Sequence, residues 1–136
     1  MERPANTTHP PPPRGLRRDQ RVRSCREFEE AYGQGSSWRG RLMVLWLRSG
    51  PGAALRLGVV ASRKVGGSVQ RARAKRRLRE VYRLNRHQLA GDCDVILVAR
   101  YSLPEAPWPA VVEDLLTLAR RAGILRLDAG RGAGPG

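Results

Sequence analysis

Three short runs of hydrophobic residues, each bounded by charged or turn-forming residues, predict the strands of a small sheet. The run 41–48 is almost continuously apolar, which is typical of a largely buried strand. A second run, 55–61, follows the turn-forming residues 49–52, and we predict that it is the hairpin partner of the first. The run 94–99 predicts a further strand, and a short extra strand is expected within 38–52.

Three other segments show helical spacing. Ser24 and Glu27 have the spacing of a capping box, which predicts a helix over 25–34. A long helix is expected over 68–89, and a last one over 109–122. The long helix repeats apolar residues on one face: Ala74, Leu78, Val81, Tyr82 and Leu89. The resulting order, α-β-β-β-α-β-α, predicts an α+β fold in which a small sheet of about four strands packs with three helices.

Composition and charge narrow the class of protein. The chain has 136 residues, of which 40% are hydrophobic, and this is enough for one domain. Lys and Arg number 26 against 12 Asp and Glu, which gives a net charge of +14. Segments 14–26 and 63–87 carry +5 and +9, so the rest of the chain is close to neutral. A charge concentrated in this way indicates a polyanion or a membrane surface as the partner.

Several classes of protein are disfavoured by what the sequence lacks. No run approaches the roughly 18 apolar residues of a membrane span, and no apolar secretory segment stands near the start. Cys25 and Cys93 are isolated, so we expect neither a disulfide nor a zinc site, and we expect a cytoplasmic location. Two histidines and no Ser/His/Asp grouping disfavour a self-contained small-molecule enzyme.

The strongest motif lies in residues 56–80, which join a strand, a Ser-Arg-Lys exit, a glycine-rich turn and the start of an arginine-rich helix. Turn amides and a helix N-terminus attract anions, and arginine binds phosphate through paired hydrogen bonds. A solvated basic helix face would be the simpler explanation. Ten basic residues against one acid in 63–87 argue against that explanation and favour contacts with RNA phosphates.

These residues resemble the bacterial ribonuclease P protein subunit family, whose signature is an Arg-Asn-Arg motif followed by Lys-Arg at a helix start. This chain has Arg71-Ala72-Arg73 and then Lys75-Arg76. Ala72 replaces an asparagine that lies near a proposed metal site in the family, so no metal role is carried over. The resemblance covers about Arg21 to Leu125 and includes Arg21-Val22-Arg23, Phe28, Tyr32, Gly35, Met43–Trp46, Ser62-Arg63-Lys64 and Asp94–Arg100.

The resemblance implies a left-handed βαβ crossover made by the second predicted strand, the long helix and the last strand. Sequence reasoning without the resemblance favours the usual right-handed form. An RNA-binding α+β domain is expected over 16–127. Composition predicts a disordered Pro-rich extension over 1–15 and a disordered Gly-rich tail over 128–136.

The resemblance also implies a function in a ribonucleoprotein endoribonuclease that removes the 5′ leader from precursor tRNA. The protein would bind the catalytic RNA and the leader, and so tighten and broaden substrate binding. The RNA would hydrolyse the phosphodiester bond with Mg²⁺, so no catalytic residue or metal ligand is expected in this chain. The implied RNA-facing residues are Ser62, Arg63, Lys64, Arg71, Arg73, Lys75, Arg76 and Arg79. The implied leader-binding cleft is lined by Phe28, Tyr32, Trp46 and Arg100.

The residues themselves leave other interpretations open. Phe28 and Tyr32 lie one helical turn apart, so they and Trp46 also fit an ordinary hydrophobic core. A small basic structural protein that binds ribosomal RNA would have a similar composition. A double-stranded DNA-binding module could place helix 68–89 in a major groove, with Asn85 among its base-reading residues.

Overall fold

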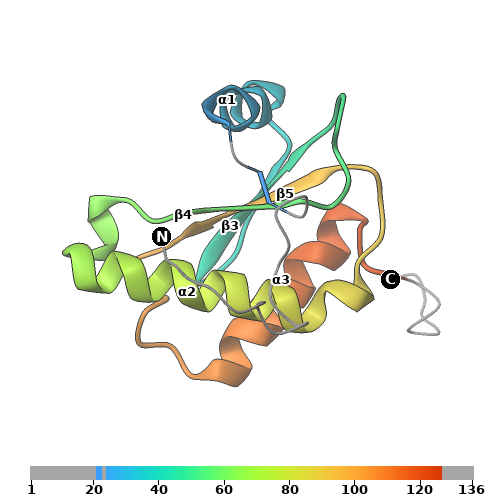
Figure 1. The fold of residues 1–136 in the computed structure, drawn as a ribbon. Helices are drawn as coiled ribbons and strands as arrows, with labels where there is room; N and C mark the ends of the chain where they lie inside the picture. The colour runs from blue at the N-terminus through green and yellow to red at the C-terminus, as the bar shows by residue number, and fades with distance from the viewer. Residues whose placement is uncertain (1–20, 23, 127–136) are drawn as a thin grey trace, which may run out of the picture.

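The computed structural model describes residues 21–22 and 24–126, so the expected extension and tail, 1–15 and 128–136, lie outside the described residues. The predicted order of helices and strands is confirmed, and so is the short extra strand (Figure 1). The elements are α1 (Cys25–Gln34), β2 (Ser37–Arg39), β3 (Met43–Arg48), β4 (Leu57–Val60), α2 (Ser68–Asn85), β5 (Asp94–Ala99) and α3 (Trp108–Ala122), with short 3₁₀ turns η2 (Arg63–Val65) and η3 (Arg86–Gln88).

Local sequence signals set the ends of the helices. The Ser24 hydroxyl accepts a hydrogen bond of 3.1 Å from a backbone N–H in the first turn of α1. Gly35 and Gly123 follow α1 and α3 with φ angles of 73° and 81°, the left-handed conformation that ends helices at low cost for glycine. The long helix is shorter than predicted, because α2 ends at Asn85 and the chain continues as η3.

The sheet has the strand order β2-β3-β5-β4, and this corrects one prediction. Segment 55–61 is not the hairpin partner of 41–48, because β5 lies between β3 and β4. The loop that follows β3 crosses the end of β5, where the backbone N–H groups of Ala54 and Arg56 donate to the Asp94 carboxylate at 3.1 Å. The turn-forming sequence shows that the chain turns, but it carries no information on this anchor some forty residues away in the chain.

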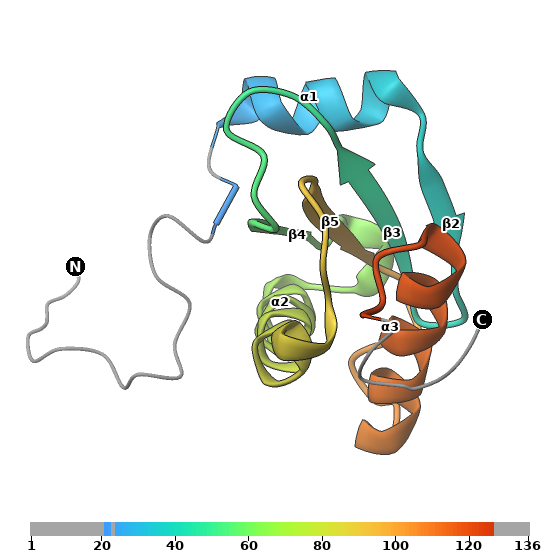
Figure 2. The same cartoon turned by 90° about the vertical axis from the view of Figure 1, so that its right-hand side faces the viewer.

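β4 and β5 are parallel neighbours joined through α2. In the view of Figure 2, β4 lies to the left of β5, both strands run away from the viewer, and α2 lies below the sheet. The chain therefore passes from β4 down and back through α2, and then up into the strand on the right, which is a left-handed crossover. This connection is the rare form, because about 98% of such crossovers are right-handed.

Helices cover the two faces of the sheet unequally. α2 and α3 pack on one face, and α1 lies across the other (Figures 1 and 2). The five residues predicted to form the apolar face of the long helix are all buried. They belong to a continuous core that also includes Met43, Leu45, Leu57, Val95, Leu97, Leu115 and Leu118. The face beneath α1 contributes little to this core and is the side on which the candidate site lies.

Candidate nucleic-acid interface

On the face of the sheet toward α1, side chains form three rows across the strands, because alternate residues of a strand point to the same side. Met43 and Leu45 point to the opposite face and into the core, as the alternation along 41–48 predicts. We name the rows ionic, aromatic and valine. They consist, in that order, of Arg48 and Asp94; of Trp46, Ile96 and Gly58; and of Val44, Val98 and Val60.

The aromatic row lies directly beneath α1. Tyr32 of α1 meets Trp46 edge to face, with ring centroids 5.0 Å apart and planes at 80°. Tyr32 is 40% exposed, and Trp46 is half-buried outside the core. Phe28 packs on Gly58 so closely that a Cβ there would lie 2.7 Å from its ring. The structure thus brings the three predicted cleft aromatics together on one face.

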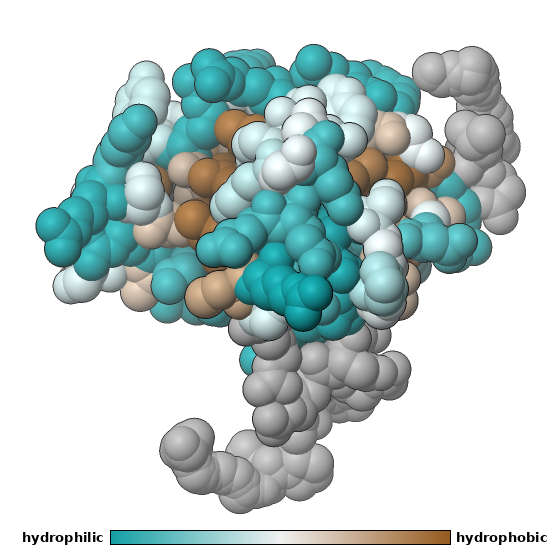
Figure 3. Space-filling model, turned by 90° about the horizontal axis from the view of Figure 1, so that it is seen from above, coloured by the Kyte–Doolittle hydropathy of each residue, from teal (hydrophilic) through white to brown (hydrophobic). Residues whose placement is uncertain are grey.

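The valine row extends from the aromatic row beyond the cover of α1. Its three side chains are half-buried, and none of them belongs to the core. Figure 3 looks down on the side of the molecule that carries α1, and hydrophobic surface shows on both sides of the largely hydrophilic strip in the middle of that view. An open apolar floor next to exposed aromatic edges suits the stacking of unpaired nucleic-acid bases.

Arg100, the fourth predicted cleft residue, directly follows β5, two residues beyond Val98 of the valine row. Its backbone N–H donates to the Leu42 carbonyl at 2.9 Å, and its guanidinium donates to the Gly40 carbonyl at 2.7 Å. The structure therefore places Arg100 at the rim, apart from the aromatic contacts, with one of its donors already used within the protein.

The Ser-Arg-Lys segment follows β4 directly. Arg63 and Lys64 form η2, and the Ser62 hydroxyl accepts a hydrogen bond from the Lys64 backbone N–H at 3.3 Å. All three side chains are exposed. Since Val60 ends the valine row, the two cations of this segment stand just beyond that end of the apolar floor.

The predicted RNA-facing residues of α2 divide between two sides of the helix. Arg71 donates to the Gly66 carbonyl at 3.2 Å, which ties it to the glycine turn. Arg73 approaches Glu105 at 3.9 Å on an exposed surface, where such pairs add little stability. Lys75 is half-buried, and the exposed Arg76 has no acidic partner within the described part of the chain.

Arg79 lies on the side of α2 that faces the edge of β4, where the first described residues also run. Val22 donates its backbone N–H to the Leu57 carbonyl at 2.8 Å, so this segment is held along β4. Arg21 and Arg79 enter one pocket of about 190 Å³, which Phe28 also lines. Burial and the neighbouring Arg21 lower the pKa of Arg79. The two basic segments of the sequence thus meet in space.

Arg77 has a structural role that charge counting does not reveal. Its guanidinium donates to the carbonyls of Leu103, Pro104 and Ala106 at 2.7 to 3.0 Å and lies 5.6 Å from the ring centroid of Trp108. It joins α2 to the loop before α3. Arg76 is exposed, although the two neighbours contribute equally to a count of charge.

The DNA-groove interpretation loses its main base-reading candidate. Asn85 is only 8% exposed, and its amide donates to the Val81 carbonyl at 2.8 Å. The Asn85 side-chain oxygen also accepts from Gln88 at 3.1 Å. Asn85 therefore closes the end of α2 and does not present its side chain to a groove.

An ionic cluster missed by the sequence reasoning surrounds the ionic row. Arg48 and Arg56 both donate to the buried Asp94 carboxylate, at 2.8 and 2.7 Å. Burial alone would raise the pKa of Asp94, but hydrogen bonds from Arg56, from two backbone N–H groups and from Arg48 hold that pKa below its usual value. A hydrogen bond from Arg56 likewise lowers the pKa of Glu27. No local sequence pattern predicts these ion pairs, because the paired residues lie far apart in the sequence.

Other kinds of site find little support in the described residues. They include no group of three or more His, Cys, Asp or Glu side chains placed to hold a metal ion. Both cysteines are free; Cys25 is exposed, and burial raises the pKa of the Cys93 thiol. Within the same residues, no helix has the length and hydropathy needed to cross a membrane.

A mixed four-stranded sheet with aromatic residues on one face, bordered by clustered arginines, is the arrangement expected of a small α+β RNA-binding protein. The sequence profile of the Ribonuclease P family matches residues 16–123. The chain belongs to the ribonuclease P protein family, whose members are RNA-binding subunits of a tRNA-processing ribonuclease.

Curated relatives and solved structures agree with this assignment. The chain is 35% identical over 108 residues to the ribonuclease P protein component of Clostridium botulinum strain Loch Maree, with 79% of this chain and 97% of the relative covered. It is 38% identical to the component of Desulfovibrio desulfuricans, covering 78% and 85%. The RNase P protein of Thermotoga maritima superposes with a TM-score of 0.66 at 30% identity, covering 74% of this chain and 96% of that one.

Proposed function

We propose that this chain binds the RNA subunit of ribonuclease P through its arginine-rich surface and the 5′ leader of precursor tRNA through the cleft beside α1. The observation that carries the proposal is the pocket shared by Arg21, Arg79 and Phe28. The pocket connects the basic side of α2 with the aromatic row, so RNA bound along this surface can contact both the arginines and the aromatic side chains.

The two parts of this surface suit different features of RNA. Arginine guanidinium groups bind phosphates through paired hydrogen bonds, and they release counterions that had neutralised the RNA. Tyr32 and Trp46 offer ring edges and faces to unpaired bases without demanding a particular sequence. A leader, which varies in sequence, is a ligand of this kind.

In this proposal the chemistry belongs to the RNA. The acidic side chains of α1 that lie beside the ionic row, those of Glu27 and Glu30, are paired with arginines on the side away from the open valine row. Magnesium is assigned to the RNA, where it would activate the attacking water. The protein holds the RNA and the leader in place, and it does so in the cytoplasm.

Adjacent arginines on α2 give a matched test of RNA binding. Binding of the protein to ribonuclease P RNA should weaken with salt, with log K falling against log salt at a slope of about −3 to −5 if about five arginines meet phosphates. Arg76→Ala should reduce that slope by about one and leave the unfolding midpoint unchanged. Arg77→Ala should lower the unfolding midpoint and leave the slope unchanged, because its guanidinium is bonded within the protein.

The measurements are RNA titrations at several salt concentrations, with a denaturant melt of each variant. A flat salt response, or equal loss of RNA binding in both variants, would contradict the proposal.

A further inference from the structure

α1 presents three differently composed sides to its surroundings. Ala31 points straight at the sheet and is the one buried residue among the described residues of this helix. Phe28 and Tyr32 form an aromatic side toward the cleft. The opposite side is polar and carries three residues at helical spacing: Glu27, Glu30 and Gln34.

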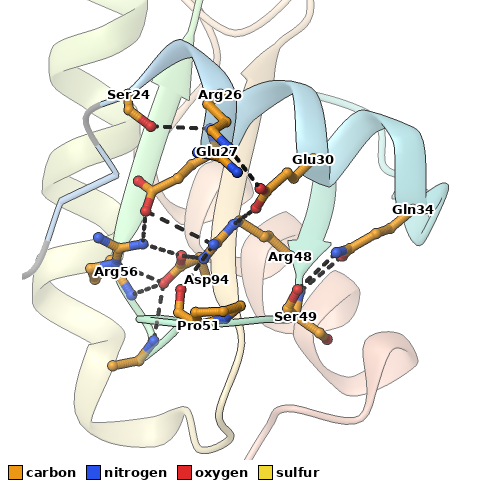
Figure 4. Close-up of polar contacts among 11 residues, drawn as sticks. Ser24, Arg26, Glu27, Glu30, Gln34, Arg48, Ser49, Pro51, Arg56 and Asp94 are labelled. Carbon is orange, nitrogen blue, oxygen red and sulfur yellow. Dashed lines mark hydrogen bonds and ion pairs between the residues drawn. The ribbon is translucent and has the colours of Figure 1, made fainter.

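Each polar residue binds the segment that runs from the end of β3 to the start of β4 (Figure 4). Glu27 accepts from the Arg56 guanidinium at 2.8 Å, and Glu30 accepts from Arg48 at 2.8 Å. Gln34 makes two bonds with the backbone of Ser49, donating at 2.7 Å and accepting at 2.8 Å. We call these three side chains and their partners the polar clamp.

The clamp is attached to a rigid base. Arg48 is 3% exposed and Asp94 is fully buried, and the two are joined at 2.8 Å. Arg48 also donates to the Pro51 carbonyl at 2.9 Å. The base therefore fixes both the sheet and the loop after β3, and the charged partners of α1 have little freedom to move.

The clamp determines where α1 lies, because so little apolar surface holds the helix. Ala31 is the one fully buried contact, and the packing of Phe28 on Gly58 and of Tyr32 on Trp46 lies on one side of the helix, so the three directional polar contacts are what hold its other side. Phe28 and Tyr32 are on the same rigid helix, so the clamp also fixes their places over Gly58 and Trp46.

We propose that Glu30 and Gln34 are positioning residues for the leader: by fixing α1 on its polar side, they set the spacing between its aromatic side and Trp46. The proposal rests on the proposed function, because it concerns the cleft assigned to the leader.

The test compares Glu30→Gln with Gln34→Ala, singly and together, in the protein assembled with ribonuclease P RNA. Two precursor tRNAs serve as substrates, one with a multi-nucleotide leader and one with a single-nucleotide leader. The matched control is Glu29→Gln, which removes the same charge from an exposed position of the same helix and leaves the clamp bonds of Glu27, Glu30 and Gln34 in place.

We expect the double variant to bind the long-leader substrate about tenfold more weakly, which corresponds to one imperfectly stacked base. Binding of the single-nucleotide substrate should change by less than about twofold, and the same holds for the control with both substrates. Electrostatics alone predicts the opposite sign, because removing an acid makes the protein more positive and should tighten RNA binding. The sign of the change thus separates positioning from charge.

Three results would overturn the proposal. The first is an equal loss on both substrates, which would indicate a general structural defect, and denaturant melts of each variant accompany the titrations to identify it. The second is unchanged or tighter long-leader binding while Trp46→Ala still abolishes the leader preference; the leader cleft would then stand without the clamp. The third is a wild-type protein that binds both substrates equally, which would remove the proposed leader function and the clamp proposal with it.

Discussion

One face of the sheet packs against α2 and α3 through fully buried hydrophobic side chains, whereas the other face meets α1 through ion pairs and hydrogen bonds beside a few partly exposed aromatic contacts. Apolar burial supplies most of the stability of a fold and is tolerant of small shifts. Ion pairs add little net stability but demand one geometry. The comparison indicates that the first face keeps the protein folded, and the second keeps an aromatic surface exposed and correctly spaced.

This division also explains why aromatic residues can remain accessible. If α1 packed on the sheet through a wide apolar stripe, Tyr32 and Trp46 would be buried in a hydrophobic core. Instead, Tyr32 stays 40% exposed while the helix is anchored through its opposite side. The aromatic side chains thus remain available for binding on the face of the sheet toward α1, where packing is less hydrophobic than on the opposite face.

The largest effect is expected from removing the buried carboxylate of Asp94, to which the ion pairs beneath α1 are anchored. Asp94→Ala leaves the buried Arg48 short of one carboxylate and leaves two backbone N–H groups without their acceptor. We expect the free energy of unfolding to fall by about 3–5 kcal/mol, as measured in a denaturant titration. Asp92→Ala, an exposed change two residues earlier, should stay within about 0.5 kcal/mol.

Acid titration sharpens the same prediction. The pKa values of Asp94 and Glu27 are lower in the folded protein than in the unfolded chain. Their stabilising contribution is therefore complete above the unfolded values, near pH 4, and is lost as the pH falls through the folded ones. Asp94→Ala should flatten this acid-dependent loss of stability. An acid-dependent loss of stability identical to that of the wild type would show that the Asp94 carboxylate does not contribute to it.

A change on the opposite face should cost almost as much but leave no pH signature. Leu78 is fully buried between α2 and the sheet, so Leu78→Ala should lower the free energy of unfolding by about 2–5 kcal/mol. Leu84→Ala, on the same helix but exposed, is the control. If Leu78→Ala altered the leader preference of the folded protein, the two faces would not be separable.

The smallest expected effect concerns binding. Trp46→Ala should weaken binding of a long-leader precursor tRNA by about 1–3 kcal/mol, with little loss for a single-nucleotide leader, because a stacking partner is removed. Trp38 packs against the core, so Trp38→Ala should lower stability instead. A collapse in stability for Trp46→Ala, with equal loss on both substrates, would assign Trp46 to the core.

Local patterns predicted most elements of this fold, because caps, apolar periodicity and turn residues act within a few positions. Ser24, Gly35 and the alternation around Trp46 are examples. The pairing of strands was mispredicted, since the choice of β5 over β4 as the neighbour of β3 depends on contacts across the whole chain. Clustered charge found the basic surface, but it could not separate Arg76 from Arg77, whose partners lie in a distant loop. The polar clamp joins residues 15 to 29 positions apart and has no local signature.

The central place of β5 in the sheet has a consequence for how the chain folds as it is made. β5 is the last strand to be synthesised among those of the described residues, yet β3 and β4 each bond to it and not to each other. A growing chain that ends before Asp94 can form α1, α2 and the β2–β3 pair, but of the residues that the structure describes, β4 then has beside it only the short Arg21–Val22 segment. Sheet and core must therefore close together once β5 emerges, and long-range closure of this kind makes for slow, concerted folding.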